Sequence, residues 1–179
     1  MEALDDLRIA NYCHPDCVPL LNIMRLPREE AFWLAYAMAE RNQGAASIGC
    51  FADFENYYPF RLEVDALLRR SFVAQGGRPK TEHPLSFVLQ GSEYLNAWFD
   101  RGIVTKIPLK NIPSECVSFT LSDSMAGFRR NGTLTVMTKE ALMRMIREHG
   151  GAMEDFMRMM EEKHHYIEAQ LWDDGYAKP

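Results

Sequence analysis

The chain has few of the features that mark a metalloprotein or a membrane protein. Among its 179 residues are four cysteines, spaced as one C-x-x-x-C and two single residues. A structural zinc site needs four ligands, so we expect no metal, although Cys13, His14, Asp16 and Cys17 are close in sequence. The richest apolar run, AFWLAYAMA, covers about nine residues. A membrane span needs ~18, so no membrane partner is expected.

Positive charge and phosphate-binding glycine motifs are also scarce. The chain has 20 Lys and Arg against 25 Asp and Glu, a formal net charge of -5 at pH 7. This balance argues against non-specific nucleic-acid binding as the main role, although a local basic pocket stays open. Neither GxxxxGK[ST] nor GxGxxG occurs. The acidic start, MEALDDLRIANYC, shows no signal peptide, and we expect a cytoplasmic location.

The composition that remains is that of one globular domain over residues 1–179. Hydrophobic residues make up 47% and charged residues 25%. Residue alternation predicts strands at 7–13, 46–51, 85–90, 103–109, 116–121 and 166–172, and helical spacing predicts helices at 27–42, 60–75, 92–100, 139–149 and 153–164. Asn131-Gly132 predicts a tight turn. Without a regular β-α-β rhythm, we predict an α+β fold with mixed or mostly antiparallel sheets and about five helices.

The last predicted strand, YIEAQLW, carries the best functional lead. Alternation places two sets of side chains on opposite faces: Ile167, Ala169 and Leu171 on a core face, and Tyr166, Glu168, Gln170 and Trp172 on the other. In one interpretation Glu168 is solvated and the two rings pack over a helix. In the other, the rings wall a cleft in which the glutamate orients a hydroxyl or stabilises a developing positive charge.

Three further segments are candidates with weaker patterns. The loop GGRPKTEHP could hold a phosphate through Arg78 and Lys80, or carry those charges for solubility. The segment CFADFENYYPFR favours aromatic packing at a helix start, although Tyr58 and Arg61 could line a cleft. Seven methionines between residues 137 and 160 indicate core packing or a surface for self-association through the C-terminal helices.

The order of three segments resembles ADP-ribosyltransferase-like domains, in particular the nucleic-acid-modifying branch found in toxin–antitoxin systems. These segments are YCHPDCVPLLNIMRL, HPLSFVLQGSEYLNAWFDRG and YIEAQLW. The resemblance implies a split, mixed sheet that grips NAD, as co-substrate, in a central cleft. It implies that Glu168 is catalytic on a late strand, that His14 contacts the adenosine ribose, and that Tyr57 or Tyr58 stacks on the nicotinamide.

The chain also departs from that family. Gln90 stands at the strand-to-helix junction where the toxin branch offers an arginine, so Arg78 is the candidate partner for the pyrophosphate. Gln170 follows Glu168 in the wrong order for the paired glutamates of the arginine-specific branch. The expected function is NAD-dependent modification of a nucleic acid or protein target. The alternative is a non-catalytic domain that binds a ligand, such as a nucleotide, or a partner.

Overall fold

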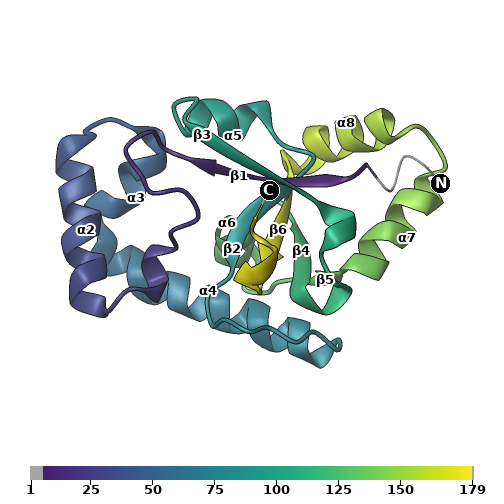
Figure 1. The fold of residues 1–179 in the computed structure, drawn as a ribbon, viewed down its shortest axis with the longest axis horizontal. Helices are drawn as coiled ribbons and strands as arrows, with labels where there is room; N and C mark the ends of the chain where they lie inside the picture. Colours follow the sequence, from purple (N-terminus) through teal and green to yellow (C-terminus); the bar gives the residue numbers. More distant parts are fainter. Residues whose placement is uncertain (1–5, 179) are drawn as a thin grey trace.

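One antiparallel sheet of six strands organises the protein. A computed structural model describes residues 6–178. The strands are β1 (Arg8–Cys13), β2 (Leu85–Leu89), β3 (Ile103–Pro108), β4 (Val117–Leu121), β5 (Met137–Thr138) and β6 (Ile167–Leu171). Their order in the sheet is β3-β1-β2-β6-β4-β5, and every adjacent pair is antiparallel (Figure 1). The last strand therefore lies inside the sheet, between β2 and β4.

Seven α-helices accompany the sheet within the described residues, which confirms the α+β class. They are α2 (Arg28–Arg41), α3 (Gly49–Ala52), α4 (Phe54–Ala74), α5 (Glu93–Trp98), α6 (Ser124–Asn131), α7 (Lys139–His149) and α8 (Met153–His164). Short 3-10 turns are η1 (Ile23–Arg25), η2 (Ala46–Ile48), η3 (Leu109–Asn111), η4 (Ser114–Cys116) and η5 (Asp174–Tyr176). Helices α2 and α3 lie at one end of the molecule and α7 and α8 at the other (Figure 1).

Two local predictions are wrong. Residues 46–51 form η2 and the start of α3 rather than a strand, because Phe51 packs edge-on against Phe54 of α4 in a separate cluster, with ring centroids 5.8 Å apart. Asn131-Gly132 ends a helix rather than forming a separate tight turn. Gly132 has φ 66°, and its N–H donates to the Phe128 carbonyl at 2.8 Å, which is the left-handed cap that glycine favours. The prediction of residues 92–100, 139–149 and 153–164 as helices is confirmed within a few residues.

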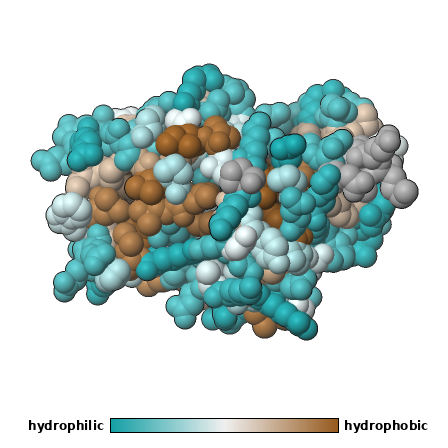
Figure 2. Space-filling model, in the orientation of Figure 1, coloured by the Kyte–Doolittle hydropathy of each residue, from teal (hydrophilic) through white to brown (hydrophobic). Residues whose placement is uncertain are grey.

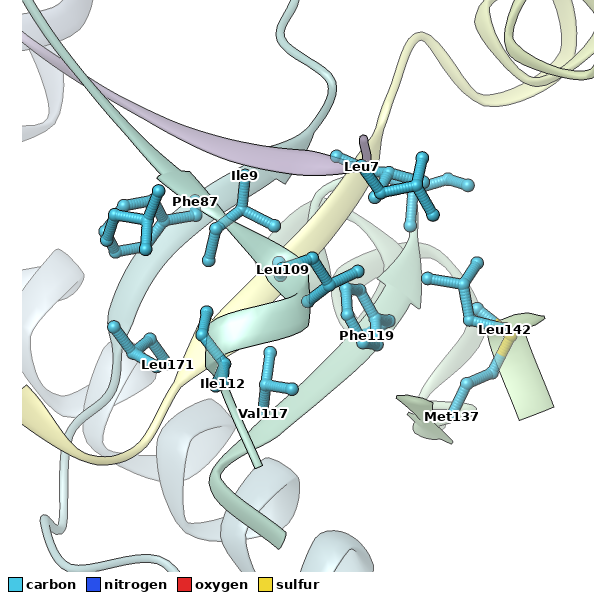
Figure 3. Packing of buried hydrophobic residues seen from close by; sticks show 14 of the residues in the cluster. Leu7, Ile9, Phe87, Leu109, Ile112, Val117, Phe119, Met137, Leu142 and Leu171 are labelled. Carbon is cyan, nitrogen blue, oxygen red and sulfur yellow. The ribbon is translucent and has the colours of Figure 1, made fainter. Parts of the chain in front are cut away.

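The two faces of the sheet carry separate hydrophobic clusters. On the face of Ile9, Phe87 and Phe119, the main cluster includes side chains from η3 and α7 (Figure 3), and further side chains from α8. All seven methionines between residues 137 and 160 belong to this cluster or pack against it. Their use in the core is thus observed, while self-association stays a prediction. On the opposite face, α4 and α6 pack around Trp172.

A third cluster joins α2, α3 and α4. Its buried members are Met24, Ala31, Ala35 and Phe54. Phe32 packs edge-on against Phe54, with ring centroids 4.9 Å apart. Within residues 6–178, no helix combines the length and the apolar composition needed to cross a bilayer.

Candidate functional site

Two adjoining cavities open on the sheet face that α4 and α6 cover. The first, here the Glu168 cavity, has a volume of about 410 Å³ and is lined by parts of β1, β2, β6, α4, α5 and α6. The second, the His14 cavity, has a volume of about 230 Å³ and lies between β1, the loop after it, α3 and α4. Five residues line both cavities: Asn11, Tyr12, Arg61, Ser86 and Phe99. The two spaces are therefore parts of one cleft.

The carboxyl group of Glu168 lies at the wall of the first cavity. It projects from the central strand β6, opposite Val88 of β2 and Thr120 of β4. The residue is only 5% exposed, so the solvated interpretation is wrong. Its oxygens accept hydrogen bonds from the Ser124 backbone N–H at 2.6 Å and from the Ser124 hydroxyl at 3.2 Å. These donors hold the carboxyl group in one orientation.

The environment of Glu168 disfavours its charged form. Burial, and next the charge of Asp123, raise the pKa of Glu168 to about 7 from its ordinary value of 4.5. The Arg61 guanidinium and the Ser124 donors act in the opposite direction. Because this pKa is near neutrality, Glu168 can hold or release a proton under ordinary conditions. Such tuning is common where a carboxyl group does chemistry.

A second carboxylate reaches the same cavity from the start of α6. Asp123 caps that helix by accepting the Ala126 N–H at 2.6 Å. Its other oxygen lies 3.4 Å from the Tyr166 hydroxyl, whose pKa is raised, first by burial and then by Asp123. Asp123 and Glu168 therefore line the same cavity in different surroundings: Asp123 is half-buried, whereas Glu168 is buried.

Gln170 and Trp172, on the same face of β6, do not line either cavity. The Gln170 amide bridges two hydroxyl groups of β4: its oxygen accepts from Ser118 at 2.8 Å, and its nitrogen donates to Thr120 at 3.0 Å. The Trp172 indole N–H donates to Ser118 at 2.8 Å, and its ring stacks on Phe72 of α4 with centroids 6.1 Å apart. This part of the face is closed and its polar groups are satisfied.

Arg61 lies at the junction of the two cavities. It is 8% exposed and forms an ion pair with Asp65, one helical turn further along α4, with 2.6 Å between Nη2 and Oδ1. At this distance the pair is a charge-assisted contact that holds one edge of the guanidinium group. Asp65 is fully buried and also contacts His83 at 2.8 Å. Burial alone would lower the pKa of Arg61, but the charge of Asp65 outweighs it and raises the pKa, so Arg61 stays protonated.

His14 and Tyr57 line the second cavity. The Nδ1 atom of His14 accepts the Asp16 backbone N–H at 3.2 Å, which leaves Nε2 as donor to Asp100 at 3.0 Å. Both ring nitrogens are thus engaged, and a ribose contact would replace one of these bonds. Tyr57 stacks on Phe54 with centroids 5.8 Å apart, and burial raises its pKa above the ordinary value.

The other predicted cofactor residues lie outside both cavities. Tyr58 packs in the third cluster, with its ring 5.3 Å from that of Phe32. Arg78 is exposed in its loop, where its backbone N–H donates to the Glu115 carbonyl at 2.8 Å. The Gln90 side chain accepts the Arg8 N–H at 2.9 Å at the end of β2. Gln170 is the buried bridge described above.

Sequence reasoning missed the aromatic rim of the cleft and the role of Asp123. Tyr94 and Trp98 of α5 line the Glu168 cavity, and their rings stack with centroids 6.0 Å apart. They are 51% and 41% exposed, and their i,i+4 spacing in EYLNAW is a signal that could have revealed the pair. At the other mouth, Figure 2 shows apolar atoms gathered over the loop after β1, where the exposed Val18 and Leu21 line the His14 cavity.

Cysteines and metal ligands have no visible role in this cleft. Within the described range, no three His, Cys, Asp or Glu side chains gather as a metal site would require. Cys13 and Cys17 border the His14 cavity as free thiols, and burial raises the pKa of both, that of Cys13 to about 11. Reactive thiolates are therefore scarce here at neutral pH.

Comparisons with family models, with curated proteins and with solved structures give no significant match to this chain. Its function is therefore inferred from the geometry and chemistry of the cleft.

Proposed function

We propose that the protein is an NAD-dependent ADP-ribosyltransferase-like enzyme in which Glu168 is the catalytic residue. The observation that carries this proposal is the buried Glu168 carboxyl group at the wall of a cavity of about 410 Å³, held by two donors from Ser124. NAD supplies a ribose carbon that becomes electron-poor as its bond to nicotinamide breaks. An ionised Glu168 beside that carbon stabilises the developing positive charge.

The walls of the Glu168 cavity suit a flat cation. Tyr12, Tyr94, Trp98 and Tyr166 supply aromatic surfaces, and Asp123 and Glu168 supply negative charge. A pyridinium ring is planar and positive, so it gains both cation–π and Coulomb attraction in such a space. This attraction is lost when the ring leaves as neutral nicotinamide. The cavity therefore holds the charged reactant better than the released product.

The cavity also contains a group that can accept the proton released in the transfer step. When an acceptor hydroxyl or amine of a nucleic acid or protein attacks the ribose carbon, the electron pair of the breaking bond leaves with nicotinamide. The proton released by the acceptor passes to Asp123, the second carboxylate of the cavity. Glu168 must be ionised to act, so the turnover of the free enzyme should rise with pH through about 7.

The test is turnover of labelled NAD, measured as nicotinamide release and as label transferred to nucleic-acid and protein mixtures. We expect Glu168→Gln to lower turnover by roughly 100-fold or more, the usual cost of losing a group that stabilises transition-state charge. Glu154→Gln, at an exposed position of α8, is the matched control. Equal turnover in wild type and Glu168→Gln would contradict the proposal.

Non-catalytic ligand binding is the second candidate, and the exposed Tyr94–Trp98 stack at the cavity mouth favours it. Stable NAD binding without turnover in the wild type would select this candidate. Self-association through α7 and α8 stays a separate prediction that light scattering can test.

A further inference from the structure

Two residues line the His14 cavity with hydrogen-bonding groups that the protein does not use. One is Arg61, of which only Nη2 is paired within residues 6–178, with Asp65 Oδ1 at 2.6 Å. The other is Ser47, whose hydroxyl is buried and unpartnered within that range. Buried polar groups are nearly always satisfied, and leaving one unsatisfied is costly, so such a pair requires an explanation.

The distribution of charge indicates what would satisfy them. Among the residues that line the His14 cavity, Arg61 is the only one with a fixed charge. The two carboxylates, Asp123 and Glu168, line the other cavity. The cleft is therefore acidic and aromatic at one end and has an arginine at its junction. A ligand with a positive ring and a negative group beside it matches this order.

Asp65 and His83 hold the arginine in place without entering either cavity. Asp65 is 0% exposed, and its two oxygens contact Arg61 at 2.6 Å and His83 at 2.8 Å. The backbone carbonyl of His83 in turn accepts the Arg25 Nε–H at 2.8 Å. This series of contacts fixes one edge of the Arg61 guanidinium group. The remaining N–H groups are left to bind a ligand in a geometry set in advance.

We propose that Arg61 and Ser47 form an oxyanion site that binds the diphosphate of a nucleotide. A guanidinium donates to two phosphate oxygens at once, and a hydroxyl can donate to a third. A cavity of about 230 Å³ accommodates a diphosphate, and the adjoining space of about 410 Å³ accommodates a ring and its ribose. The proposal rests on the proposed function in that the diphosphate would be that of NAD. The sequence-based candidate for this role, Arg78, lies outside the cleft.

The experiment is a titration of the full chain with ADP, AMP, adenosine and inorganic pyrophosphate, followed by calorimetry. We expect the wild type to bind ADP and pyrophosphate and to bind adenosine much more weakly. Arg61→Lys keeps the charge and removes the fork, and it should weaken ADP binding roughly 10- to 100-fold, as for a lost charge-assisted hydrogen bond. Ser47→Ala should weaken it less. Arg70→Gln, on the exposed side of α4, should leave it unchanged.

A second variant separates binding from folding. Removing Arg61 alone would leave the buried Asp65 without its arginine partner and with His83 as its remaining contact. Arg61→Gln is therefore combined with Asp65→Asn, which makes both positions neutral. Far-ultraviolet circular dichroism shows whether this double variant is folded. If it is not folded, the ADP affinity of Arg61→Lys decides the test. Wild-type affinity for ADP in either folded variant would overturn the proposal, as would a wild type that binds neither ADP nor pyrophosphate at millimolar concentration.

The outcome for this site is independent of turnover. If ADP binding depends on Arg61 but no NAD turnover occurs, the oxyanion site holds and the transferase proposal fails. If NAD is turned over while Arg61→Lys binds ADP normally, the transferase proposal holds and the oxyanion site fails.

Discussion

Two neighbouring parts of one strand face are built in opposite ways. Gln170 and Trp172 lie in a closed region in which each polar group finds a partner on β4 and the indole ring packs against α4. Glu168, two residues earlier, faces a cavity, and the pKa of its carboxyl group is raised. The register explains part of the difference, because Gln170 is flanked by Ser86 and Ser118, whereas Glu168 is flanked by Val88 and Thr120. The closed part stabilises the fold, and the open part carries a cost that chemistry can use.

The largest effect is expected in the closed part. Trp172→Ala removes a fully buried ring and its bond to Ser118, so the free energy of unfolding should fall by about 3–5 kcal/mol. Urea denaturation measures this difference. Trp33→Ala, at a side chain 73% exposed, is the control and should change stability little. Similar losses in the two variants would contradict the view that stability is concentrated around Trp172.

The hydrogen-bonded bridge should come next. Gln170→Ala leaves the buried Ser118 and Thr120 hydroxyls each short of a partner, and we expect a loss of about 1–3 kcal/mol. The matched control is Gln43→Ala, at an exposed position in the turn after α2. Denaturant unfolding of the two variants measures this loss of stability. If Gln170→Ala loses no more stability than the control, water replaces the Gln170 bridge.

In the open part, replacing Glu168 should raise the stability of the protein rather than lower it. Because the pKa of Glu168 is raised to about 7, the folded protein binds more protons than the unfolded chain between the ordinary value of 4.5 and 7. Stability contributed by this group is therefore lost as pH rises through that range. Glu168→Gln should be more stable than wild type at pH 8, by ~1–2 kcal/mol, and the gain should shrink toward pH 5.

The measurement is the melting temperature of both proteins across that pH range. A constant difference between pH 5 and pH 8 would mean that Glu168 titrates normally and that the cavity does not perturb its charge. The comparison of the two parts of the face would then reduce to packing alone.

The smallest effect on stability is expected at the rim. Tyr94→Ala removes an exposed ring that stacks on Trp98 and on His165, and should change the free energy of unfolding by no more than about 0.5 kcal/mol. Its affinity for a cationic ring such as 1-methylnicotinamide should nevertheless fall, as titration can measure. Unchanged affinity would remove the rim from the ligand site.

The sequence predicted which side chains of a strand share a face better than it predicted which helices cover that face. Alternation in YIEAQLW correctly divided β6 into two faces, since that division depends only on strand geometry. It could not show that α4 and α6 would close one half of the second face. That closure depends on contacts such as Phe72 of α4 with Trp172, which are 100 residues apart in sequence.

The same limit explains the cleft residues. Arg61 and Asp65 are one helical turn apart, so their pairing could be read from the sequence, but the contact of Asp65 with His83 could not. Asp123 went unnoticed because the helix that it caps, α6, was not predicted. The Asn131-Gly132 pair at the end of that helix predicted a tight turn, and the helix cap that forms instead uses the left-handed conformation that glycine favours.

The placement of the three tryptophans makes the protein a natural fluorescence reporter. Trp172 is fully buried, Trp98 is at the mouth of the Glu168 cavity, and Trp33 is exposed on α2. In a Trp33→Phe background, the emission of the remaining two indoles separates by wavelength, the shielded ring emitting further to the blue. Quenching at the red edge would then follow a ligand entering the cleft, while a red shift of the blue component would follow unfolding, in the same cuvette and without any attached dye.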